Sequence, residues 1–170
     1  MAETYTIRNV KDVEELEKAP LAERITAGST LELIQQGADL DPDAVALTFL
    51  RDGESWDQPV EIPYRELIGK IRQSANMFAD LGVGPRDVVT YLLPSLPQTH
   101  YVLWGAEAAG IANPINPLLE ADTIRDICQA AGTKVLVALG ETPGADIWQK
   151  VEAIRRGTPT LRSVVRVMGP

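Results

Sequence analysis

The segment Val88–Leu119 carries a single formal charge, Glu107, although charged residues make up 24% of the chain. A segment so poor in charge must be buried, either in a bilayer or in a protein core. A membrane-spanning helix needs about 20 consecutive and mostly apolar residues. Prolines interrupt this segment at positions 94, 97, 114 and 117. We therefore expect no membrane span here, but a buried core made of strand, turn, helix and strand.

Helical and strand patterns alternate from Tyr64 to the end of the chain. The clearest helix is 64–81, whose apolar residues recur at helical spacing, and the continuous apolar run Val88–Leu92 is typical of a strand covered on both faces. Helices follow at 97–109, 120–131 and 146–156, and strands at 111–115, 134–139 and 163–167. The 97–109 helix is apolar nearly all round, which predicts deep burial. This order predicts an α/β fold, doubly wound, with a mainly parallel sheet and helices on both faces.

The part before Tyr64 has a different pattern. Residues 1–29 are expected to be a peripheral segment with a short acidic helix at 11–18. A helix capped by Thr30 should close near Gly37, followed by a turn at 39–42. Residues 44–62 predict a small β-hairpin around Asp52-Gly53. Residues 30–170 would then form the α/β domain. Because only Met168, Gly169 and Pro170 follow the last strand, we expect a truncated domain, cut inside a larger one.

Composition excludes several classes of function. The net charge is −8, and residues 1–87 hold 17 acids against 9 bases, which argues against a general nucleic-acid binder. One cysteine allows no internal disulfide, and one His with one Cys makes a zinc site improbable. The first ten residues lack the apolar run of a signal peptide, so a cytoplasmic location is expected. No Gly-x-x-x-x-Gly-Lys-Ser/Thr phosphate loop occurs.

The most distinctive candidate for a site is residues 113–117, Asn-Pro-Ile-Asn-Pro, directly after a buried strand. Each residue before proline is pushed toward an extended conformation, and Asn side chains can bond their own backbone. Two interpretations are open. The segment is a rigid turn from strand to helix, or Asn113 and Asn116 form a wall of a substrate cleft.

Other candidates favour structural roles. His100 and Glu107 share a helix face, but seven helical residues span about 10.5 Å, too far for a proton relay. Cys128 lies at an inward helical position and should behave as a small apolar group. Gly82–Gly84 follows a predicted helix and precedes a predicted strand, so it fits a turn that ends the helix. Gly140–Gly144 joins a strand to a helix, where open α/β sheets bind ligands, but it lacks the Ser, Thr and Lys set of a phosphate site.

Four motifs, taken in order, resemble the N-terminal region of the adenylate-forming superfamily, specifically the acyl-CoA synthetases or AMP-dependent synthetases and ligases. Residues 63–67 (Pro-Tyr-Arg-Glu-Leu) are similar to the family's Thr/Ser-Tyr-x-Glu-Leu, and 82–89 (Gly-Val-Gly-Pro-Arg-Asp-Val-Val) to its Gly-Val-x-x-Gly-Asp-x-Val. Residues 93–98 (Leu-Pro-Ser-Leu-Pro-Gln) resemble Leu-Pro-Asn-x-Pro-Glu, and 108–117 resemble Lys-Ala-Gly-x-x-x-Pro-x-Asn-Pro. The likeness covers roughly residues 30–170. Pro63, Arg86 and Ser95 depart from it, at scaffold positions.

The resemblance implies a parent protein that joins a carboxylic acid to CoA through an acyl-adenylate, using ATP, Mg²⁺ and CoA, as a cytoplasmic ligase of fatty-acid metabolism. The family's Ser/Thr-Gly-Ser/Thr-Thr-Gly-x-Pro-Lys-Gly loop and its other catalytic groups have no counterpart here. We therefore expect no catalytic, cofactor-binding or metal-binding residue in this chain. The chain would be inactive alone, and its partner would be the remainder of the synthetase.

Two alternatives stay open: a stand-alone, non-catalytic interaction or small-molecule-binding module, and a small nucleotide-binding protein. Apolar surfaces that the rest of the synthetase would cover should be exposed in this chain and should favour self-association.

Overall fold

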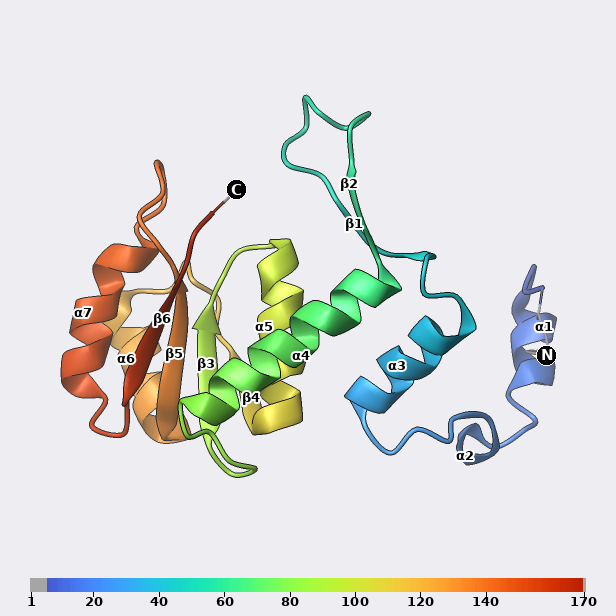
Figure 1. The fold of residues 1–170 in the computed structure, drawn as a ribbon, viewed down its shortest axis with the longest axis horizontal. Helices are drawn as coiled ribbons and strands as arrows, with labels where there is room; N and C mark the ends of the chain where they lie inside the picture. The colour runs from blue at the N-terminus through green and yellow to red at the C-terminus, as the bar shows by residue number, and fades with distance from the viewer. Residues whose placement is uncertain (1–5, 170) are drawn as a thin grey trace.

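A computed structural model describes residues 6–169. Its centre is a parallel sheet of four strands: β3 (Val88–Leu92), β4 (Ile111–Pro114), β5 (Thr133–Leu139) and β6 (Ser163–Val167). Their order across the sheet is β4-β3-β5-β6 (Figure 1). All five residues of β3 are buried, as its continuous apolar run predicts.

Helices cover both faces of this sheet. They are α4 (Tyr64–Asp80), α5 (Pro97–Ala109), α6 (Ala121–Ala131) and α7 (Ile147–Gly157). The helix α4 packs on α5, and α6 packs on α7. Right-handed crossovers place α5 on one face and α6 and α7 on the other, because the chain moves from β3 to β4 in one direction and then reverses toward β5 and β6. The predicted doubly wound α/β fold is confirmed.

The segment before α4 extends away from the sheet (Figure 1). It contains α1 (Val10–Leu16), α2 (Leu21–Arg24) and α3 (Thr30–Leu40), and neither α1 nor α2 has a buried residue. The strands β1 (Val45–Phe49) and β2 (Val60–Pro63) form the antiparallel hairpin that residues 44–62 predict. No helix within residues 6–169 is long and apolar enough to cross a membrane.

Two local predictions about α3 are wrong. Its N-cap is Ser29, whose hydroxyl accepts a hydrogen bond from the Glu32 backbone N–H, and Thr30 is the first helical residue. The helix also continues past Gly37 to Leu40. Gly37 packs closely on Tyr64, and a Cβ there would lie 3.1 Å from its ring. The turn therefore begins later, where the Asp41 carboxylate accepts hydrogen bonds from the backbone of Asp43 and Ala44.

The predicted deep burial of α5 holds for only part of the helix. Val102, Gly105 and Ala106 are buried, and Gly105 brings α5 so close to α4 that an added Cβ would lie 2.5 Å from the Ser74 Cβ. Glu107 and Ala108, in contrast, are exposed. Because α5 has no polar face, its outer side presents small apolar residues and one carboxylate to a groove rather than to a packed core.

Candidate functional site

The carboxyl ends of the parallel strands are the first place to look for a site. In open α/β sheets ligands bind outside these ends, where the strand order reverses. Here the order reverses between β3 and β5. The loops at this edge are residues 93–96 after β3, 115–120 after β4 and 140–146 after β5.

Asn113 and Asn116 come from the β4 side of this edge but make different contacts. The Asn113 amide donates a hydrogen bond of 3.0 Å to the Thr90 hydroxyl, which lies 2.6 Å from the Thr133 hydroxyl. Asn113 thus joins β4 to two buried threonines. Asn116 is exposed, and its side-chain oxygen accepts a hydrogen bond of 3.0 Å from the Leu118 backbone N–H. Asn113 faces the sheet interior, whereas Asn116 shapes the loop.

Lys150 of α7 holds the same loop from outside. Its Nζ lies 3.0 Å from the backbone oxygens of both Pro117 and Leu119, and 3.1 Å from the Asp146 carboxylate. Its side chain is only 11% exposed. Sequence reasoning missed this lysine. The available signal is its position, because Lys150 falls on the same helical face as the buried residues Ile147, Val151 and Ile154.

The 140–146 loop is tied to β6. The Gly140 backbone N–H donates to the Val167 oxygen at 2.8 Å, and Arg166 pairs with Glu141 at 2.9 Å. The guanidinium carbon of Arg166 also lies 5.5 Å from the centre of the Trp148 ring. These contacts make the loop a fixed connection between strand and helix.

The turn into β3 is fixed by a single carboxylate. Asp87 accepts hydrogen bonds of 2.8 Å from the Gly84 backbone N–H and from Lys134 Nζ. The hydrogen bond from Lys134, followed by that from Gly84, lowers the pKa of Asp87. Gly82 adopts a left-handed φ of 80° just after α4, as expected of a glycine that ends a helix.

His100 lies against a cavity of about 130 Å³ between α5 and the hairpin. The cavity is lined by apolar residues of β1, including Leu47 and Phe49, and by Ser95, Leu96 and Pro97. The imidazole centre is 5.3 Å from that of the Trp104 ring. Burial lowers the pKa of His100 below its ordinary value of 6.5.

We predict that the one histidine of the chain titrates in NMR with a midpoint below 6.5. Because the folded state favours the neutral ring, the stability that His100 contributes is fully present above pH 6.5. It declines as the pH falls from there toward the lowered pKa. His100→Gln should remove this part of the pH dependence in a denaturation series. A midpoint at or above 6.5 would contradict the described burial.

Cys128 is fully buried on α6, beside Thr90 and Thr133. Burial raises the pKa of its thiol, and the hydrogen bonds to the two threonines only partly oppose that shift. A buried, protonated thiol is a poor nucleophile and metal ligand. In residues 6–169, no three His, Cys, Asp or Glu side chains gather in a way that could hold a metal ion.

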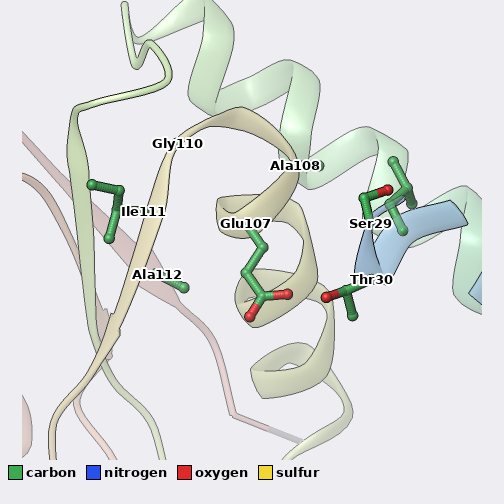
Figure 2. A pocket seen from close by; sticks show the side chains of 8 residues that line it. Ser29, Thr30, Glu107, Ala108, Gly110, Ile111 and Ala112 are labelled. Atoms are coloured by element: carbon green, nitrogen blue, oxygen red, sulfur yellow. The ribbon is translucent and has the colours of Figure 1, made fainter. Parts of the chain in front are cut away.

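A cavity of about 540 Å³ lies away from the carboxyl ends, beside the start of β4 (Figure 2). It is formed by the N-terminal end of α3, the C-terminal turn of α5 and the outer edge of β4. Its lining residues are Ser29, Thr30, Leu31, Glu107, Ala108, Gly110, Ile111 and Ala112. We call it the Glu107 groove. The sequence did not predict it, because α3 and β4 are far apart along the chain, although the lone charge in an uncharged segment was a signal.

Comparisons with known proteins agree with this architecture. The family model described as "AMP-binding enzyme" matches residues 34–168. A marinolic acid–CoA ligase of Pseudoalteromonas sp. (strain SANK 73390) is 30% identical over 164 residues, which cover 96% of this chain and 25% of the ligase. An acetyl-coenzyme A synthetase of Methylobacterium radiotolerans is 29% identical over 91 residues, covering 53% of this chain and 14% of that protein.

Solved structures of the same class share the fold. The acetoacetyl-CoA synthetase from Streptomyces lividans superposes with a TM-score of 0.71 and 28% identity, over 80% of this chain and 21% of that protein. An anthranilate CoA ligase in complex with anthranoyl-AMP gives a TM-score of 0.68 with 22% identity, over 81% and 24% of the two chains.

The chain belongs to the family of AMP-binding enzymes. Within that family it corresponds to the N-terminal region of an adenylate-forming acyl-CoA synthetase, as its four motifs indicate. The chain spans a quarter or less of the length of the curated relatives it matches.

Proposed function

We propose that this chain is the N-terminal part of an acyl-CoA synthetase and supplies scaffold rather than catalytic groups. The whole protein would activate a carboxylate with ATP, releasing pyrophosphate, and pass the acyl group from AMP to the CoA thiol. The observation that carries the proposal is the family match over residues 34–168 in a chain that spans 25% of a CoA ligase. The whole protein is proposed to be a cytoplasmic enzyme of fatty-acid metabolism.

The chemistry of the described residues supports this division of labour. Adenylation builds negative charge on phosphate oxygens, so it needs cationic donors, a carboxylate for Mg²⁺ and backbone N–H groups that face the phosphates. At the carboxyl ends of the strands, Lys150 and Arg166 are already engaged by backbone oxygens, acids and an aromatic ring. ATP, Mg²⁺ and CoA would therefore be held mainly by residues outside this chain, which would be inactive alone.

Asn113 and Asn116 are proposed to contribute one wall of the substrate cleft. The support is positional, since both residues lie at the carboxyl end of β4, which neighbours β3, and the strand order reverses on the other side of β3. Asn116 is exposed there and could meet a ligand directly. Asn113 would act from within the sheet, by holding β4 on Thr90.

Calorimetric titration with ATP and Mg²⁺ separates this proposal from a small nucleotide-binding protein. We expect no saturable heat with the isolated chain. The reading frame after the codon for Pro170 separates it from a stand-alone module. A continuing frame that encodes the Gly/Ser/Thr loop supports the proposal, and a natural stop codon overturns it.

We also propose that the chain self-associates through uncovered surfaces. Three exposed apolar residues support this: Ile111 in the outer strand β4, Leu118 in the loop after β4, and Met168 directly after β6. Light scattering at increasing concentration should show a dimer or larger species. A monomer throughout the accessible range would refute self-association.

A further inference from the structure

The Glu107 groove combines one carboxylate with uncharged walls. Its volume of about 540 Å³ falls within the range of about 300–1,000 Å³ that is usual for small-molecule sites. Among the described residues that line it there is no base and no aromatic residue. Anionic ligands need bases, and quaternary ammonium ligands are held by aromatic cages, so the groove suits neither class.

The charge of Glu107 has no counter-charge within the groove. Glu107 forms no salt bridge with any residue from 6 to 169. The elements that form the groove, α3, α5 and β4, contain neither Lys nor Arg. The charge of Glu107 also acts on the phenol of Tyr91, whose pKa is raised first by burial and then by this carboxylate. The groove therefore suits a ligand that brings a positive charge.

Two helix ends border the groove, and their partial charges agree with a cation beside Glu107. The helix α5 ends at Ala109 without a base in its last turn, so its final carbonyl groups present an unbalanced partial negative charge. The helix α3 begins at Thr30 with the opposite partial charge. Glu32 of its first turn offsets that charge and accepts a hydrogen bond of 2.7 Å from the Gly28 backbone N–H. The end of α5 therefore adds to the attraction for a cation.

Hydrogen-bond acceptors of three elements face the same space. Figure 2 shows the carboxylate of Glu107 on α5 and the hydroxyl of Thr30 on α3 pointing toward one another across the groove. The third acceptor is the backbone oxygen of Ala112. The N–H of Ile111 donates to the Asp87 oxygen on the β3 side, and backbone groups alternate along a strand, so the Ala112 oxygen points to the outer side of β4. An ammonium group is a compact charge with three N–H donors, which matches this set of acceptors.

We propose that the Glu107 groove binds a small primary amine in its ammonium form, with a short apolar body. The ammonium group pairs with Glu107 and donates hydrogen bonds to the Thr30 hydroxyl and the Ala112 backbone oxygen. The apolar body lies against Leu31 and Ile111, of which Ile111 is 46% exposed in the structure. The groove lies at the amino ends of the strands, opposite the loops at their carboxyl ends. This inference goes beyond the proposed scaffold function and does not rest on it.

An NMR titration of the ¹⁵N-labelled chain with 2-phenylethylamine tests the site, because amide shifts report both binding and its place. We expect saturable shifts in residues 29–31 and 107–112, with a dissociation constant of about 1 mM when the amine is added to about 20 mM. Two matched probes are the controls. 2-Phenylethanol has the same apolar body without the charge, and MgCl₂ supplies positive charge without an apolar body. Neither should reproduce the saturable shifts.

Substitutions in the groove test the proposed contacts. Glu107→Gln keeps the shape of the side chain but removes its charge, and it should raise the dissociation constant of the amine by about tenfold or more. Thr30→Val keeps the branched shape but removes the hydroxyl, and it should raise the constant by about fivefold. Glu14→Gln on the exposed helix α1 changes the net charge as Glu107→Gln does, and it should leave binding unchanged.

Saturable shifts in the groove that weaken in both groove variants, but not in Glu14→Gln, support the amine site. The proposal is overturned if the amine causes no saturable shift, or if Glu107→Gln binds it as the wild type does. Equal shifts with 2-phenylethanol or with MgCl₂ would overturn it as well, because the groove would then select only for an apolar body or for any cation. The same spectra show whether each variant keeps the fold. Failure of amine binding leaves the scaffold proposal standing, since that proposal concerns adenylation.

Discussion

Replacing Gly110 by alanine is expected to cost about 3 kcal/mol of folding stability. Gly110 ends α5 and precedes β4, and a Cβ there would lie 2.6 Å from the Asp87 backbone oxygen and 2.8 Å from the Gly84 backbone oxygen. Neither oxygen can move easily, because the Asp87 carboxylate binds both Gly84 and Lys134 and so fixes the turn. The new methyl group must therefore displace β4 or the turn.

Urea denaturation followed by circular dichroism measures this effect as a fall in the transition midpoint. Gly69→Ala is the matched control. Gly69 lies inside α4 with nothing within 4 Å of its added Cβ, so the control should gain about 0.5–1 kcal/mol from helix propensity. If Gly110→Ala were as stable as the wild type, the close approach of these two segments would be wrong.

Lys150→Met should cost about 2 kcal/mol and loosen the loop after β4. Methionine keeps much of the buried stem but removes the ammonium group that binds the Pro117 and Leu119 oxygens. These oxygens would then have to find water or remain unpaired. Hydrogen exchange should increase in residues 115–120 more than in β3. Lys70→Met, on the exposed side of α4, is the control for loss of charge and should change neither quantity.

Equal exchange in the two variants would show that Lys150 does not hold the loop. An increase spread evenly over the whole chain would point instead to general destabilisation. The comparison between residues 115–120 and β3 therefore decides whether Lys150 positions the Asn116 region.

The strands and helices of the sheet domain were predictable because their patterns are local. The continuous apolar run of β3 and the helical spacing of α4 each require only one element to be buried, and both are confirmed. The end of α3 was not predictable in this way. The helix continues through Gly37 to Leu40, and Gly37 packs on Tyr64, a contact with a distant part of the chain that no local pattern shows. The partial exposure of α5 was not predictable from its own sequence either, because it depends on how α3, which is distant along the chain, packs beside it.

The candidate site was predictable only in part. The two Asn-Pro pairs predicted a constrained segment after β4, and Asn116 does bond its own loop. The contacts of Lys150 and the Glu107 groove join segments that are distant in sequence, so no local pattern could place them. Each nevertheless had a chemical signal in the sequence. For Lys150 it is a lysine on an apolar helix face, and for the groove it is Glu107, a lone carboxylate in an otherwise uncharged segment.

The central claim is that this chain is scaffold for an adenylation reaction whose reactive groups lie elsewhere. Exchange of radiolabelled pyrophosphate into ATP tests it most directly, with the purified chain, Mg²⁺ and a panel of carboxylic acids of different chain lengths. We expect a signal equal to that of a heat-treated sample for every acid. Reproducible exchange above that baseline with any one of them would mean that these residues contain a working adenylation site, and would contradict the account.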